Sequence, residues 1–80
     1  MTTNAARNAA RRMETSIRRI DEAETARDAV AFINWRECNK HAARADVWRE
    51  KSFVAATALD AEVGAGGWGW NSNTGTVFFN

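Results

Sequence analysis

Proline is absent from this sequence, and glycine is absent from everything before Gly64. Both residues interrupt helices, so their absence from residues 1–63 predicts an almost entirely helical segment. Alanine, arginine and glutamate, which favour helices, are abundant there. The sequence therefore predicts a mainly α fold that changes character at the first glycine.

Residues that support catalysis or metal binding are also scarce. The chain has one cysteine and one histidine, which cannot form a disulfide framework or complete a zinc site alone. Cys38 and His41, with Glu37 beside them, have the spacing of part of a metal site or of a nucleophile pair. No second cysteine or histidine completes such a site, so we interpret the two residues as a buried thiol beside a surface histidine. No phosphate-binding glycine loop and no Ser/His/Asp arrangement is present. We therefore expect a protein without cofactor, metal or enzymatic activity.

Large apolar residues are few as well. Hydrophobic residues make up 45% of the 80, but 16 of them are alanine and only one is leucine. A core in a chain of this size rarely supplies more than about 3–5 kcal/mol. No uncharged apolar stretch approaches the length of a membrane span. We expect one small domain, 1–80, in the cytoplasm (a host cytoplasm if a phage encodes it), stabilised by its own C-terminal aromatics or by a partner.

The apolar periodicity predicts a two- or three-helix bundle, with helices at about 4–20, 25–39 and 46–63. Polar residues that can cap helices occur near 20–25 and 39–46, although one continuous helix from 25 to 63 is an alternative. The segment around Val30, Ile33 and Trp35 is apolar on two sides, which predicts burial between neighbours. Trp35 and Trp48 are expected to pack together. A narrow seam on the first helix consists of Ala6, Ala10, Met13, Ile17 and Ile20.

Beyond the helical body 1–63, residues 64–67 form a glycine-rich joint and residues 68–80 an aromatic hairpin or tail. Two β-prone runs around an Asn/Ser/Gly turn predict a short β-hairpin at about 68–79. Trp68 and Trp70 are expected on one face, and Val77 and Phe79 on another. These aromatics either fold back onto the thin helical body or serve as anchors for a partner.

Positive charge is concentrated at the N-terminus, although the whole chain carries only +1. Five arginines form two ridges on the first helix, and these are Arg7, Arg11, Arg12, Arg18 and Arg19. Arginine forks suit carboxylates and phosphates. The ridges are either an ordinary solvated face or a surface for an acidic protein or a nucleic acid.

These patterns favour a non-enzymatic inhibitor or adaptor that binds a larger host protein or ribonucleoprotein, using the five arginines with Trp68, Trp70 and Phe79. In size and lack of catalytic motifs the chain resembles accessory proteins of phages and mobile elements, among them anti-CRISPR proteins. One alternative is a nucleic-acid-binding regulator, a homodimer through the seam of Ala10, Met13, Ile17 and Ile20. A third is a self-assembling virion protein. No membrane partner is expected.

Overall fold

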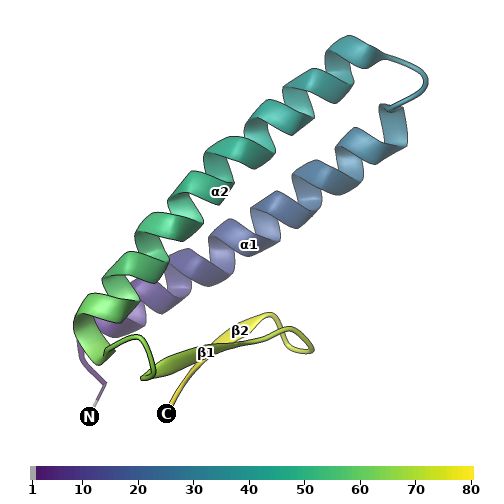
Figure 1. The fold of residues 1–80 in the computed structure, drawn as a ribbon. Helices are drawn as coiled ribbons and strands as arrows, with labels where there is room; N and C mark the ends of the chain where they lie inside the picture. Colours follow the sequence, from purple (N-terminus) through teal and green to yellow (C-terminus); the bar gives the residue numbers. More distant parts are fainter. Residues whose placement is uncertain (1) are drawn as a thin grey trace.

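The computed structural model describes residues 2–80 and contains two long helices followed by a β-hairpin. Helix α1 spans Asn4–Val30 and α2 spans Trp35–Val63, while the hairpin consists of β1 (Trp68–Asn71) and β2 (Thr76–Phe79). The helices run antiparallel, and the hairpin lies near the end where α1 begins and α2 ends (Figure 1). The mainly α fold with a C-terminal hairpin is thereby confirmed, with two helices rather than three.

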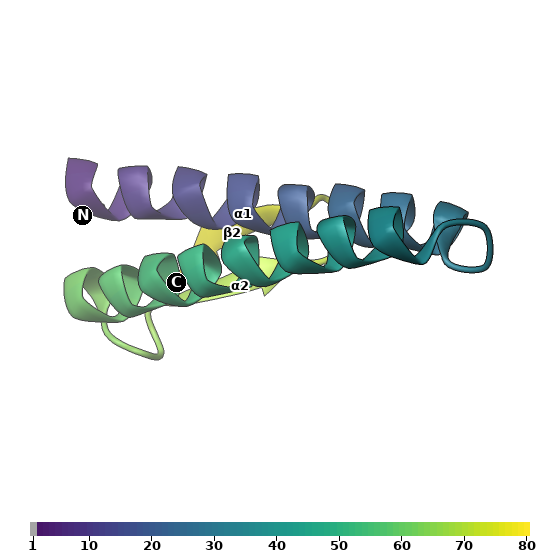
Figure 2. The ribbon, with the colours of Figure 1, turned by 90° about the horizontal axis from the view of Figure 1, so that it is seen from above.

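The hairpin covers one face of the helical pair and leaves the other face open. Viewed from above, the strands lie behind both helices and beneath the line where the helices meet (Figure 2). Strand β2 contacts α1 and β1 contacts α2. Because the hairpin is much shorter than the helices, the α1–α2 turn projects far beyond it, and the molecule is elongated, at 50 × 22 × 18 Å.

The helix interruptions expected near 20–25 and 39–46 do not occur. Helix α1 continues through the first region and α2 through the second, so the alternative of one helix from 25 to 63 is also wrong. Asp21, Thr25, Asn39 and Asp46 can each cap a helix, but a cap contributes only about 1 kcal/mol. Without glycine or proline to force a break, continued packing between the helices outweighs that contribution.

The chain reverses instead at residues 31–34, immediately before Asn34. The side-chain oxygen of Asn34 accepts hydrogen bonds from the backbone N–H groups of Arg36 and Glu37, at 3.1 and 3.2 Å. The N–H groups of Ile33 and Asn34 donate to the carbonyl of Val30. Asn34 followed three residues later by Glu37 resembles a capping box, which is the sequence signal for this helix start. The turn is therefore fixed by backbone and side-chain bonds together.

Small side chains fill the interface between the helices. The buried residues are Ala6, Ala9, Ala10, Ser16, Ala23, Ala45, Ala55 and Leu59. Alanines let two helices approach closely, and the one buried polar side chain among them is satisfied, because the Ser16 hydroxyl donates to the Arg12 carbonyl at 2.7 Å. Farther along, an Arg49–Glu24 ion pair joins the helices.

The apolar seam of α1 lies inside this structure. Ala10 is buried, and Met13 packs against the core cluster of Ala9, Ala10 and Leu59. Ile17 and Ile20, farther along the seam, are half-buried. The homodimer through the seam stays a prediction, and it would have to use the parts of these side chains that α2 and the hairpin leave uncovered.

Trp68, Trp70, Val77 and Phe79 share one face of the hairpin, contrary to the expectation of two faces. Trp68 pairs with Phe79 and Trp70 with Val77, and residues directly opposite each other in an antiparallel pair project to the same side. Trp68, Val77 and Phe79 pack against the core cluster. On the other face, Phe78 lies over Gly69, where an added Cβ would come within 2.3 Å of its ring.

Polar contacts attach the hairpin to both helices. The Trp68 indole N–H donates to Asp60 of α2 at 2.7 Å. The backbone N–H of Val77 donates to the Glu14 carboxylate of α1 at 2.9 Å, which satisfies a group that an edge strand would otherwise leave unpaired. The glycine segment permits the sharp reversal, since a Cβ on Gly67 would lie 2.1 Å from the Val63 carbonyl oxygen. The hairpin is thus a second layer of the fold.

Candidate protein-binding surfaces

The aromatic residues predicted as anchors take part in the fold. Trp68 and Phe79 pack on the core cluster, and Trp70 is half-buried on the same face. Their contact with a partner stays a prediction, because a partner would have to reach the sides of these rings that the helices leave uncovered. Of the hairpin aromatics, Phe78 is the exposed one.

The five arginines of α1 are exposed, as the helical periodicity suggests. Among the described residues, Arg19 is the one of the five that forms an ion pair, with Glu22 at 3.0 Å. Both side chains of this pair are about half exposed, so the pair adds little stability. The structure separates the arginines into two groups. Arg11, Arg12 and Arg19 line two hollows between α1 and α2 that are described below, whereas Arg7 and Arg18 line neither.

A hollow of about 540 Å³ lies between α1 and α2 on the face opposite the hairpin. Buried Ser16 and Ala55 form its floor, and Val47, Trp48 and Val54 form its α2 side. The two valines are exposed although they border an apolar space. The hollow can therefore accept apolar groups from outside the chain.

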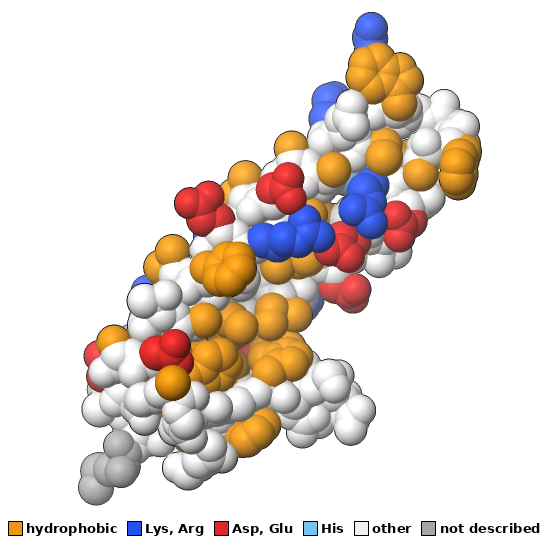
Figure 3. All heavy atoms as spheres, viewed as in Figure 1, with side chains coloured by type: hydrophobic (Ala, Val, Ile, Leu, Met, Phe, Trp, Pro, Cys, Tyr) orange, Lys and Arg blue, Asp and Glu red, His pale blue; other side chains and the backbone are white. Residues whose placement is uncertain are grey.

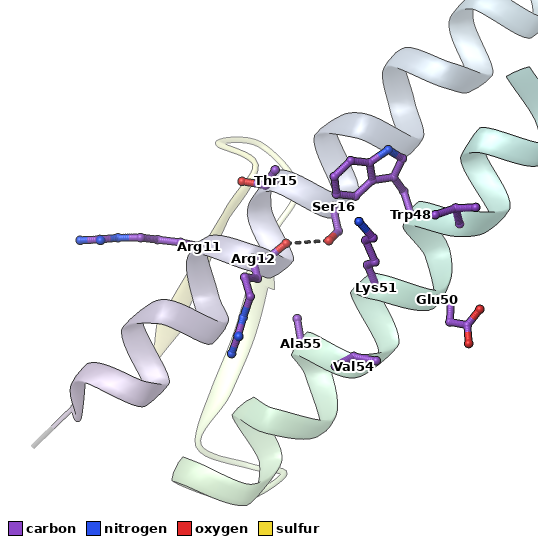
Figure 4. A pocket seen from close by; sticks show the side chains of 10 residues that line it. Arg11, Arg12, Thr15, Ser16, Trp48, Glu50, Lys51, Val54 and Ala55 are labelled. Carbon is purple, nitrogen blue, oxygen red and sulfur yellow. Dashed lines mark hydrogen bonds between the residues drawn. The ribbon is translucent and has the colours of Figure 1, made fainter.

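Charged side chains stand at the edges of this hollow. Figure 4 shows Trp48 and Lys51 reaching from α2 toward Ser16 of α1, while Arg11 and Glu50 point outward. The Lys51 ammonium lies 4.4 Å from the centre of the Trp48 ring, a distance at which a cation is attracted to the ring face. Trp48 therefore presents both an apolar surface and an adjacent positive charge.

A second hollow, of about 260 Å³, continues along the same face and shares Trp48. Its other lining residues are Arg19, Glu22, Ala23 and Arg44. We call the two hollows together the open-face groove. Five cations and two carboxylates line it, so it carries a net charge of +3. The apolar floor and walls of the groove are thus bordered by positive charge.

The two most exposed large apolar side chains of the described residues lie in the α1–α2 turn, and Trp35 follows at the start of α2. Phe32, Ile33 and Trp35 are 103%, 85% and 67% exposed, and we call them the apolar tip. Figure 3 shows hydrophobic side chains at the end of the molecule farthest from the hairpin. The Arg36 guanidinium lies 5.8 Å from the centre of the Trp35 ring. The expected burial of Ile33 and Trp35 is wrong, because Ile33 lies in the turn and Trp35 is the first residue of α2. Trp35 cannot pack on Trp48, because both belong to the same helix.

Charged pairs surround the tip without reaching it. Arg27 pairs with Asp28 at 3.1 Å, and Lys40 with Glu37 at 3.3 Å. The hydrogen bond and charge of Asp28 raise the pKa of Arg27, whose guanidinium is protonated at any ordinary pH. The residues that flank the tip in the sequence thus include two partly exposed ion pairs.

Cys38 and His41 are both half-buried on α2. Nδ1 of His41 is buried and has no hydrogen-bond partner among residues 2–80. Across residues 2–80, no three His, Cys, Asp or Glu side chains lie close enough together to hold a metal ion. Neither α1 nor α2 is long and apolar enough to cross a membrane.

No family model, curated protein or solved structure matches this chain. Function is therefore inferred from the apolar tip, the open-face groove and the arginines themselves.

Proposed function

We propose that this protein is a non-enzymatic inhibitor or adaptor that acts stoichiometrically by occupying a surface on a larger host protein or ribonucleoprotein. Phage accessory proteins such as anti-CRISPR proteins are the kind of molecule we have in mind. The apolar tip is the observation that supports this proposal most strongly. Its three side chains are 67% to 103% exposed, in a chain whose own core has few large apolar groups.

The energetics of the tip favour association. Burying a side chain such as Phe or Ile is worth about 1.5–3 kcal/mol, and tryptophan is a frequent binding hot spot. The Asn34 cap and the bonds to the Val30 carbonyl hold the tip in one backbone conformation. A surface that is already ordered loses less entropy on binding. The tip is therefore suited to insertion into an apolar pocket of a partner.

Pull-down from bacterial lysate, with and without nuclease, tests this proposal. We compare the wild-type chain with a Phe32→Ser/Ile33→Ser variant and with Phe53→Ser. Phe53 is the matched control, because it is 71% exposed on α2 away from the tip. We expect the wild type and Phe53→Ser to enrich the same host protein. The tip variant should capture at least about tenfold less of it, because a loss of about 1.4 kcal/mol corresponds to a tenfold loss of affinity.

Full retention by the tip variant would show that the tip is not the anchor, and capture of no protein would contradict the proposal itself. The tip side chains are solvated, so their replacement leaves the core intact. Far-UV circular dichroism checks that the variants fold.

Nucleic-acid binding is the second candidate, favoured by the unpaired arginines of α1. Arg7, Arg11 and Arg18 form one ridge and make no ion pair within residues 2–80. Such a ridge can follow a phosphate backbone, and its binding would weaken steeply as salt rises. The same pull-down distinguishes the two candidates, because nuclease would remove a partner held through nucleic acid and would leave a protein bound at the tip.

A further inference from the structure

We infer that the open-face groove is the docking site for an acidic amphipathic helix of a partner protein. This inference rests on the proposed function, which it makes more specific. The docked helix would lie against α1 and α2 on the face opposite the hairpin. It would take the place of a third helix, and the two-helix layer would become a three-helix bundle.

The shape of the groove suits a helix. Its floor consists of small, buried side chains, Ser16, Ala23 and Ala55, which allow another helix to approach closely. From Arg44 to Ala55 the groove follows α2 for about 17 Å, at about 1.5 Å per residue. That length accommodates about three helical turns.

The α2 side of the groove carries an apolar stripe with the spacing of a coiled-coil seam. Val47 and Val54 line the groove and are seven residues apart, and the same spacing continues beyond the groove at Ala61. This spacing keeps side chains on one face over several turns. Val47 and Val54 are 54% and 67% exposed, so α1 and the hairpin leave this part of the stripe uncovered. Helix α2 thus presents one apolar face to α1 and a second one to the groove.

The charged residues that line the groove favour a docked helix that is acidic. The lining cations are Arg11, Arg12, Arg19, Arg44 and Lys51, against Glu22 and Glu50. Arginine forks bind carboxylates with two parallel hydrogen bonds, so glutamates and aspartates along the edges of a docked helix would be well matched. A second copy of this face would bring the same net charge of +3, and the repulsion disfavours self-association here.

A designed peptide is the direct probe of the groove. We would titrate the full-length ¹⁵N,¹³C-labelled protein with an 18-residue peptide that carries leucines at heptad spacing and glutamates elsewhere. The control peptide replaces every glutamate with lysine. We expect the acidic peptide to shift the Trp48 indole N–H and the methyl signals of Val47 and Val54, and the basic peptide to bind at least about tenfold more weakly.

Substitutions at the groove locate the binding. Arg12→Glu reverses a charge at the groove, and Arg7→Glu makes the same change on the same helix outside it. We expect Arg12→Glu to weaken binding of the acidic peptide at least about tenfold, since about 1.4 kcal/mol corresponds to a factor of ten in affinity. Arg7→Glu should weaken this binding less than about threefold. Val54→Glu should weaken binding of the acidic peptide as strongly as Arg12→Glu does. All three altered positions are exposed, so the helices should remain folded.

Several results would overturn the inference: equal binding of the acidic and basic peptides, signal changes confined to the apolar tip or the hairpin, or equal effects of Arg12→Glu and Arg7→Glu. Stronger binding of a single-stranded oligodeoxynucleotide at Trp48 would also overturn it and would assign the groove to nucleic acid. Capture of a host protein through the tip does not depend on these results. If the groove does not bind the acidic peptide, the proposed function through the tip is therefore not contradicted.

Discussion

Replacing Leu59 with alanine is expected to lower the free energy of unfolding by about 2–5 kcal/mol. Leu59 is completely buried, and it joins α1, α2 and the hairpin, because it clusters with Ala9 and Ala10 while Met13 and Trp68 pack against that cluster. The alanines cannot fill the space that the leucine leaves. In a domain of this size the expected loss is comparable to the whole stability, so much of the variant should be unfolded at 25 °C.

Urea denaturation followed by circular dichroism measures this effect. Leu59→Met is the volume-conserving control and should cost less than about 1.5 kcal/mol. Val54→Ala removes apolar atoms from an exposed position of the same helix and should change stability by no more than about 0.5 kcal/mol. An unfolding free energy for Leu59→Ala equal to that of Val54→Ala would show that Leu59 is not at the centre of the core.

Enlarging Ala9 to leucine is expected to destabilise the protein by about 1–3 kcal/mol or more. Ala9 is completely buried in the cluster with Leu59, and the added atoms would push the helices or the hairpin apart. Ala5→Leu is the matched control, because Ala5 is an exposed residue of the same helix. Urea midpoints of the two variants should differ clearly, and similar midpoints would contradict tight packing at Ala9.

The double variant Ala9→Leu/Leu59→Ala exchanges the two sizes within one cluster. Substitutions at residues in contact couple, typically by about 0.5–3 kcal/mol. We therefore expect the double variant to be at least about 1 kcal/mol more stable than the sum of the two single effects. Strict additivity would mean that the two side chains do not share a packing site.

The elements governed by local chemistry could be predicted from sequence. The absence of glycine and proline before Gly64 predicts the helical body, and the Asn/Ser/Gly turn predicts the hairpin. The position of the helix break could not be predicted in the same way. Asn34, Thr25 and Asn39 are all acceptable caps, each worth about 1 kcal/mol, and packing between the helices determines which one is used. Glu37 follows Asn34 by three residues, but Asp28 follows Thr25 in the same way, so this pattern alone does not single out Asn34.

The candidate surfaces show the same difference between features that local sequence patterns predict and features that depend on packing. Exposure of the arginines follows from the seam opposite them. The roles of Trp68 and Phe79 depend on strand register, which the sequence left open and which directs both toward the core. The apolar tip was missed because the periodicity of Ile33 and Trp35 is typical of a buried helix. The groove was missed because it exists only when α1 and α2 lie side by side.

Amide hydrogen exchange on the free protein is the most direct test of the hairpin as a layer of the core. The Val77 amide is the best reporter, because it donates to Glu14 of α1 rather than to a neighbouring strand residue. We predict that Val77 exchanges as slowly as the amides around Leu59, since both should open only with the whole domain. Exchange at unfolded-chain rates throughout residues 68–79, with the helices still protected, would contradict this structure and would make the hairpin aromatics available to a partner instead.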